Sequence, residues 1–242
     1  MRTEFPNAGK YCLLSGLFLL AAVNGAHALL IDSFSTDQTL MAITPGISAS
    51  SEASGSGILG GERDMEVTRT SGTGVTIAAS EDKLTYGHIA SSQGTALLVW
   101  DGADGDSALD PTGLGGLDFT ESGLNSVVAI ELLFNDFSAP ITLTAYTDGS
   151  NYSTATLALP GNIPPDPQAT LTVLFSDFSI AAGSGADFTD IGAFSLFIDG
   201  SSTPALDVEL GSIALVPEPA TGALLLVGLL VIFLMRRRQR AS

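Results

Sequence analysis

The chain has 242 residues, of which 45% are hydrophobic and 14% are charged, and 26 acidic against 9 basic side chains give it a net charge of −17. This composition excludes a protein that binds nucleic acid through phosphate contacts, because such a protein needs a basic face. It also excludes disorder caused by low hydrophobicity, because the apolar content is sufficient for a core.

The charge is divided along the chain into three segments. Residues 1–28 carry a net charge of +1, and residues 29–216 carry 24 acidic and three basic side chains, a net charge of −21. The last residues carry four arginines. A soluble cytoplasmic protein has no reason to be divided in this way, and the pattern indicates export.

Residues 1–28 have the parts of a secretory signal peptide. Arg2 and Lys10 form a short basic region, and Cys12–Val23 is a twelve-residue apolar stretch, too short to span a bilayer stably. Ala26 and Ala28 then supply the small residues of an A-x-A cleavage site for signal peptidase. We expect cleavage after Ala28; the alternative is that this segment remains as an N-terminal anchor.

The mature chain would lack the residues that most catalytic sites use. Cys12 is the only cysteine, and removal of residues 1–28 leaves His88 as the only histidine. This excludes Cys/His zinc sites and cysteine nucleophiles, and the chain has no G-x-S-x-G nucleophile elbow. We therefore expect no enzyme and assign no catalytic residue. A secreted glycoside hydrolase with two carboxylates is the less favoured alternative, since no spacing singles out a pair.

Residues 29–215 are predicted to form one exported, all-β domain, an antiparallel β-sandwich or jelly roll. Period-two alternation or continuous apolar runs predict strands, separated by turn signals such as Asp148–Ser150 and Pro160–Asn162. The small and polar residues 48–61 are predicted to form a long flexible loop. The predicted strands cover residues 62–67, 96–100, 126–134, 141–146, 169–175, 193–198 and 206–210.

Four carboxylates follow the apolar strand that ends at Trp100. They are Asp101, Asp104, Asp106 and Asp110, interleaved with glycines. Ca²⁺ takes six to eight oxygen ligands with flexible geometry, so this loop is a candidate calcium site, although its spacing does not match an EF-hand. The alternative interpretation is a solvated acidic turn. No other cofactor is expected.

Aromatic side chains offer a second kind of binding residue, because their faces stack on sugar rings. Trp100 is the only tryptophan, and Tyr86, Tyr146 and Tyr152 are the other candidates. The position of Trp100 at the end of an apolar strand favours a core role for it. No ligand-binding residue is assigned from the sequence.

The later strands resemble those of galactose-binding-like jelly rolls. Phe188-Thr-Asp-Ile191 leads into the apolar run 193–198, and an acidic strand follows at 207–213. This resemblance implies a fold and no particular function, since such folds host many functions.

The last 27 residues combine three features in a fixed order. They are Pro217-Glu218-Pro219, an apolar stretch at residues 220–235 that is predicted to be a transmembrane helix, and an arginine-rich end, Arg236–Arg240, that stays cytoplasmic by the positive-inside rule. Both prolines hold the motif extended, as a protease requires. The alternative is an ordinary tail anchor.

This order resembles the PEP-CTERM sorting signal of exported bacterial proteins. The resemblance implies that Pro217, Glu218 and Pro219 are recognised by exosortase, a membrane-embedded transpeptidase. It also implies a precursor anchored in the inner membrane and a product at the cell surface or in the extracellular matrix.

We expect an exported surface or matrix protein, a structural or adhesive component that accompanies exopolysaccharide in a biofilm. Its expected partners are signal peptidase, exosortase, the membrane and exopolysaccharide, and not nucleic acid. The alternative is a carbohydrate-binding module that depends on calcium through the Asp101–Asp110 loop.

Overall fold

The computed structural model describes residues 28–166 and 168–217. Within these ranges no helix is long and apolar enough to cross a membrane. The predicted signal-peptide residues up to His27, the residues Glu218 and Pro219, and the predicted membrane helix at 220–235 lie outside the described residues.

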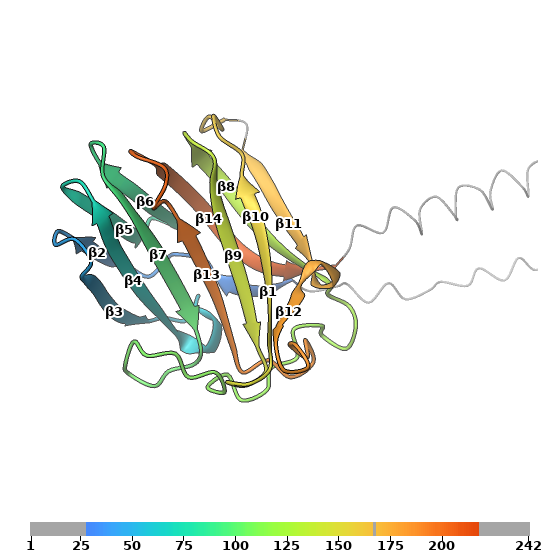
Figure 1. Cartoon of the computed structure of the whole chain (residues 1–242). Helices are drawn as coiled ribbons and strands as arrows, with labels where there is room; N and C mark the ends of the chain where they lie inside the picture. Colours follow the sequence, from blue (N-terminus) through green and yellow to red (C-terminus); the bar gives the residue numbers. More distant parts are fainter. Residues whose placement is uncertain (1–27, 167, 218–242) are drawn as a thin grey trace, which may run out of the picture.

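The described residues fold into two antiparallel sheets that lie face to face (Figure 1), which confirms the predicted β-sandwich. Sheet A has the order β11-β8-β14-β6-β5-β2, with β1 also paired to β14, and sheet B has the order β12-β10-β9-β13-β7-β4-β3. The strands are β1 Leu29–Asp32, β2 Gln38–Ala42, β3 Ser48–Ser54, β4 Glu62–Ser71, β5 Gly74–Ser80, β6 Lys83–Ile89, β7 Gln93–Trp100, β8 Val127–Asn135, β9 Ala139–Tyr146, β10 Tyr152–Leu159, β11 Ala169–Leu174, β12 Ser179–Ala182, β13 Ala193–Asp199 and β14 Asp207–Val216.

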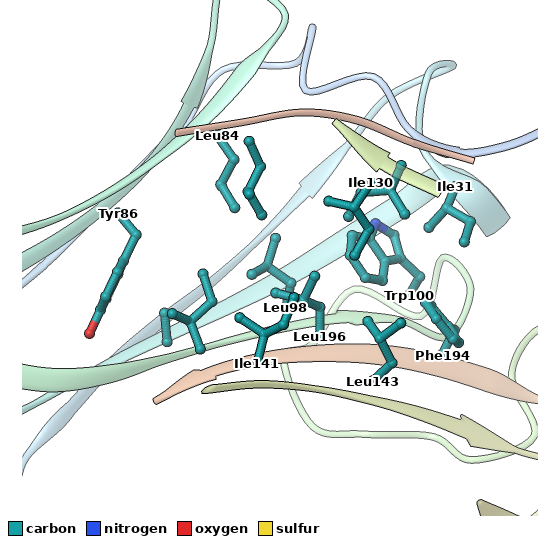
Figure 2. Close-up of a cluster of buried hydrophobic side chains, with 14 of the residues drawn as sticks. Ile31, Leu84, Tyr86, Leu98, Trp100, Ile130, Ile141, Leu143, Phe194 and Leu196 are labelled. Carbon is teal, nitrogen blue, oxygen red and sulfur yellow. The ribbon is translucent and has the colours of Figure 1, made fainter. Parts of the chain in front are cut away.

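The core fills the space between the sheets because alternate side chains of each strand point inward. In β13, Phe194, Leu196 and Ile198 are fully buried, and Figure 2 shows two of these side chains together with Ile141 and Leu143 of β9. The side chains at the intervening positions form the outer face of sheet B. Outward residues on neighbouring strands therefore lie side by side in rows across the sheet. These rows determine which side chains come together in the sites described below.

The expectation of a flexible loop at residues 48–61 is wrong for its first half. Residues Ser48–Ser54 form β3, the edge strand of sheet B, in register with β4. Small residues have weak strand propensity, but pairing and side-chain hydrogen bonds outweigh it here. The amide of Gln38 donates to the Ser51 carbonyl at 2.8 Å, and Ser48 Oγ donates to Glu66 Oε1 at 3.0 Å.

A buried ion pair joins the two sheets at one end of the core. Arg63 of β4 in sheet B and Asp32 of β1 in sheet A have side chains that are 0% exposed, with Arg63 Nη1 3.0 Å from Asp32 Oδ2. Arg63 also donates to Gln38 Oε1 at 2.8 Å and to the Thr36 carbonyl at 2.9 Å. The indole Nε1 of Trp100 donates to Asp32 Oδ2 at 2.9 Å. Both charges are thus paired and hydrogen-bonded, as burial requires.

We predict that R63M lowers the free energy of unfolding by about 3–5 kcal/mol, because Asp32 becomes an uncompensated buried charge. Urea unfolding of the full chain in detergent measures this, and fluorescence of Trp100, the only tryptophan, reports it directly. K83M is the matched control. The side chains of its ion pair, Lys83 and Glu209, are 32% and 35% exposed, so it should cost no more than about 1 kcal/mol. Equal losses in the two variants would contradict the prediction.

Candidate functional site

The four predicted calcium ligands do not come together in the structure. Asp104, Asp106 and Asp110 each accept a hydrogen bond from the backbone N–H two residues further on, at 3.1, 2.8 and 2.9 Å. Each of these carboxylates therefore closes a local Asx-turn in its own stretch of backbone. Asp104 and Asp106 are exposed, whereas Asp101 is buried. In residues 28–166 and 168–217, no group of three or more His, Cys, Asp or Glu side chains is arranged to hold a metal ion.

Asp101 instead lies beside Asp64, a residue that the sequence analysis did not single out. Asp64 faces outward from β4 opposite Val99 of β7, and Asp101 lies two residues beyond Val99, so the two carboxylates are diagonal neighbours on the outer face of sheet B. The loop after β7 folds over them. Its Gly105 N–H donates to Glu62 Oε1 at 3.0 Å, and Asp64 and Asp101 are only 3% and 1% exposed.

This carboxylate pair is poor in hydrogen-bond donors. Both oxygens of Asp64 and Oδ1 of Asp101 are buried, and among the described residues they contact each other's carboxyl group but accept no hydrogen bond from a donor outside the pair. Oδ2 of Asp101 accepts the Asp110 N–H at 2.7 Å. Burial, followed by the charge of Asp101, raises the pKa of Asp64 to about 8, and burial also raises the pKa of Asp101.

The other sequence candidates are divided between the core and the surface. Trp100 is fully buried and stacks on Phe194 with 6.1 Å between ring centroids, which confirms its core role. Tyr86 is 1% exposed and its hydroxyl lies 2.7 Å from Nε2 of buried His88, so neither side chain is available to a surface ligand. Burial lowers the pKa of His88 and raises that of Tyr86.

Tyr146 and Tyr152 face outward as a pair on sheet B. They are directly opposite each other in β9 and β10, with ring centroids 5.3 Å apart and planes inclined by 37°. Two further rows of outward residues continue the surface, and Thr142 Oγ1 lies 2.9 Å from Thr156 Oγ1 in one of them. We call this surface the tyrosine–threonine face; its residues are Tyr146, Tyr152, Ala193, Thr144, Thr154, Ser195, Thr142, Thr156 and Phe197.

The tyrosine–threonine face contains no charged side chain, although residues 29–216 carry a net charge of −21. Strand geometry gives it a width of about 10 Å across three strands and a length of about 13 Å. It offers two aromatic rings and, besides the tyrosine hydroxyl groups, five threonine and serine hydroxyl groups, although Thr144 and Ser195 are only 9% and 4% exposed. Such a surface can stack on sugar rings and exchange hydrogen bonds with their hydroxyl groups.

A hollow of about 240 Å³ lies on the outer face of sheet A. It forms where Gly87 has no side chain, and Asp207, Glu209 and Phe134 contribute to its lining. Burial, followed by the charge of Asp136, raises the pKa of Asp207. Of the residues that line this hollow, Tyr86 was a candidate in the sequence.

The end of the described chain lies beside its beginning. Leu215 of β14 pairs with Leu29 of β1, and Ser126 N–H donates to the Val216 carbonyl at 3.2 Å. Pro217 is therefore the first residue after an internal strand, and the tail starts at that point. Residues 215–239 match the family model of the PEP-CTERM protein-sorting motif. The chain carries a PEP-CTERM sorting motif. This motif implies export, a membrane-anchored precursor and processing by exosortase.

No curated protein matches the chain, and the solved structures named below resemble it only distantly. A family 11 carbohydrate-binding module from Clostridium thermocellum, in complex with a beta-1,3-1,4-mixed-linked tetrasaccharide, is 12% identical, with a TM-score of 0.35 and coverage of 76% of this chain and 96% of the module. The family 11 module of a cellulosomal cellulase of the same organism is 10% identical, with a TM-score of 0.38 and coverages of 79% and 95%. An agarase is 11% identical, with a TM-score of 0.41 and coverages of 63% and 22%. Likenesses this weak leave the function to be argued from the residues of this chain.

We predict that D64N stabilises the metal-free protein increasingly as the pH rises from 4 to 8. The folded state holds a proton on Asp64 up to its pKa of about 8, whereas the unfolded value is 3.8, so the parent protein loses stability across this window and D64N does not. The gain in melting temperature should grow by roughly 2–4 °C for each kcal/mol. Calorimetry of the full chain with chelator measures it. The exposed variant D106N is the control, and melting temperatures of parent and D64N that stay parallel across the window would contradict the prediction.

Proposed function

We propose that this PEP-CTERM protein is a non-enzymatic component of the cell surface or extracellular matrix that adheres to exopolysaccharide. The observation that supports this most directly is the tyrosine–threonine face. An uncharged surface with paired tyrosines on a strongly acidic domain suits a polymer of hydroxyl-rich, uncharged rings. An anionic polymer would be repelled by the remaining surface.

The carboxylate pair of the domain does not support glycoside hydrolysis. Asp64 and Asp101 are 3% and 1% exposed, so a sugar cannot reach them. They are also in contact, whereas the two carboxyl groups of a glycosidase are held about 5 Å or more apart to flank the scissile bond. A binding role for the surface therefore fits the described residues better than a hydrolytic one.

We predict that the double variant Y146A/Y152A binds the native exopolysaccharide roughly tenfold more weakly, because each lost aromatic contact is worth about 0.5–1.5 kcal/mol. Affinity electrophoresis in gels that contain the purified exopolysaccharide measures the change. F137A is the matched control, since Phe137 is 50% exposed in the turn between β8 and β9. Unchanged retention of the double variant, or equal loss in F137A, would contradict a role for this face.

We predict that the mature protein at the cell surface ends near Pro217–Pro219 and lacks Arg236–Arg240. Mass spectrometry of the C-terminal peptide measures this, and the same peptide from cells without exosortase should retain the arginines. An intact Arg240 on surface protein would contradict sorting by this route. This test is independent of polysaccharide binding.

A further inference from the structure

The buried pair of Asp64 and Asp101 lacks the partners that buried carboxylates normally have. The two residues are 3% and 1% exposed, and three of their four carboxylate oxygens have no hydrogen-bond partner outside the pair. A buried polar group without a partner is costly, and a buried charge is more so. Such oxygens point to a ligand that supplies positive charge.

The residues that the structure describes supply no ion-pair partner at this point. The nearest basic residue in sequence, Arg63, points to the opposite side of sheet B, where it binds Asp32 in the core. In the part of the chain that the structure describes, the ion pairs are those of Arg63 with Asp32 and Lys83 with Glu209, and neither includes Asp64 or Asp101. Glu62 and Asp104 add further negative charge around the pair.

The other acidic groups nearby are already occupied by hydrogen bonds. Glu62 accepts Gly105 N–H on one carboxylate oxygen and Ser54 Oγ–H on the other, at 3.0 and 2.9 Å. Asp104 accepts the Asp106 N–H at 3.1 Å. Among the described residues, the buried carboxylate oxygens without a partner are therefore those of Asp64 and Asp101, and they are covered by the loop that follows β7.

We propose that Asp64 and Asp101 together bind one Ca²⁺ ion beneath this loop. Carboxylate oxygens are the ligands that hard divalent cations prefer. The three free oxygens would supply at most half of the six to eight oxygen ligands that Ca²⁺ takes. Backbone carbonyls and water would supply the rest. Mg²⁺ fits less well, because it demands near-ideal octahedral geometry, whereas Ca²⁺ accepts a flexible arrangement of oxygen ligands. The ion would fix the loop to the outer face of sheet B.

Calcium titration of the full chain in detergent, after treatment with EDTA, tests this site. We expect one Ca²⁺ per chain by calorimetric titration, and a rise in melting temperature of roughly 5–10 °C at a hundredfold excess over the dissociation constant. D64N and D101N should abolish both effects. D106N, which changes an exposed carboxylate of the same loop, should retain them.

The contrary outcomes are equally distinct. Absence of a calcium-dependent shift in the parent protein would overturn the proposal and leave a pair of carboxyl groups that shares a proton. Retained calcium binding in D64N, or its loss in D106N, would place the ion elsewhere in the loop. Equal stabilisation by Mg²⁺ would overturn the assignment to calcium. D64N alone decides the matter if D101N does not fold. Polysaccharide binding is not part of this readout.

Discussion

The fully buried ion pair between Asp32 and Arg63 determines how the two sheets meet. A salt bridge inside a core is expensive unless every remaining donor and acceptor is satisfied, and here Gln38, Thr36 and the indole of Trp100 complete the set. The pair comes from the first strand of sheet A and the fourth strand in the chain, which belongs to sheet B. It therefore fixes one relative position of the sheets, which apolar packing alone would specify less sharply.

The fold class could be predicted because alternation with a period of two survives in most strands. Ile141–Tyr146 and Leu206–Leu210 alternate clearly, and the structure has strands at both places. Ser48–Ser54 could not be predicted, since small residues on an edge strand carry no hydrophobic signal and the strand depends on pairing with β4. Strand order was equally inaccessible, because β14 finds β8, β6 and β1 only through long-range contacts.

The candidate sites show the same contrast between features that the local sequence predicts and features that depend on long-range pairing. Trp100 was expected in the core from its position at the end of an apolar run. The loop acids Asp104 and Asp106 were expected to converge, but local backbone hydrogen bonds use them, a competition that short acidic side chains enter readily. The signal that was overlooked is the alternating series Glu62, Asp64, Glu66 in one strand, but only the register of β4 with β7 placed one of these acids beside the end of β7. The tyrosine–threonine face required the register between β9 and β10.

The position of β14 has a mechanical consequence for a chain held by its tail. The strand lies inside sheet A, paired with β8 along one side and with β6 and β1 along the other, and the tail leaves from its last residue. A pull on the tail acts along the strand, so it loads these rows of hydrogen bonds together, in shear. A strand pulled sideways from an edge would instead release its bonds one at a time. The domain is thus attached through an internal strand that is hydrogen-bonded along both sides.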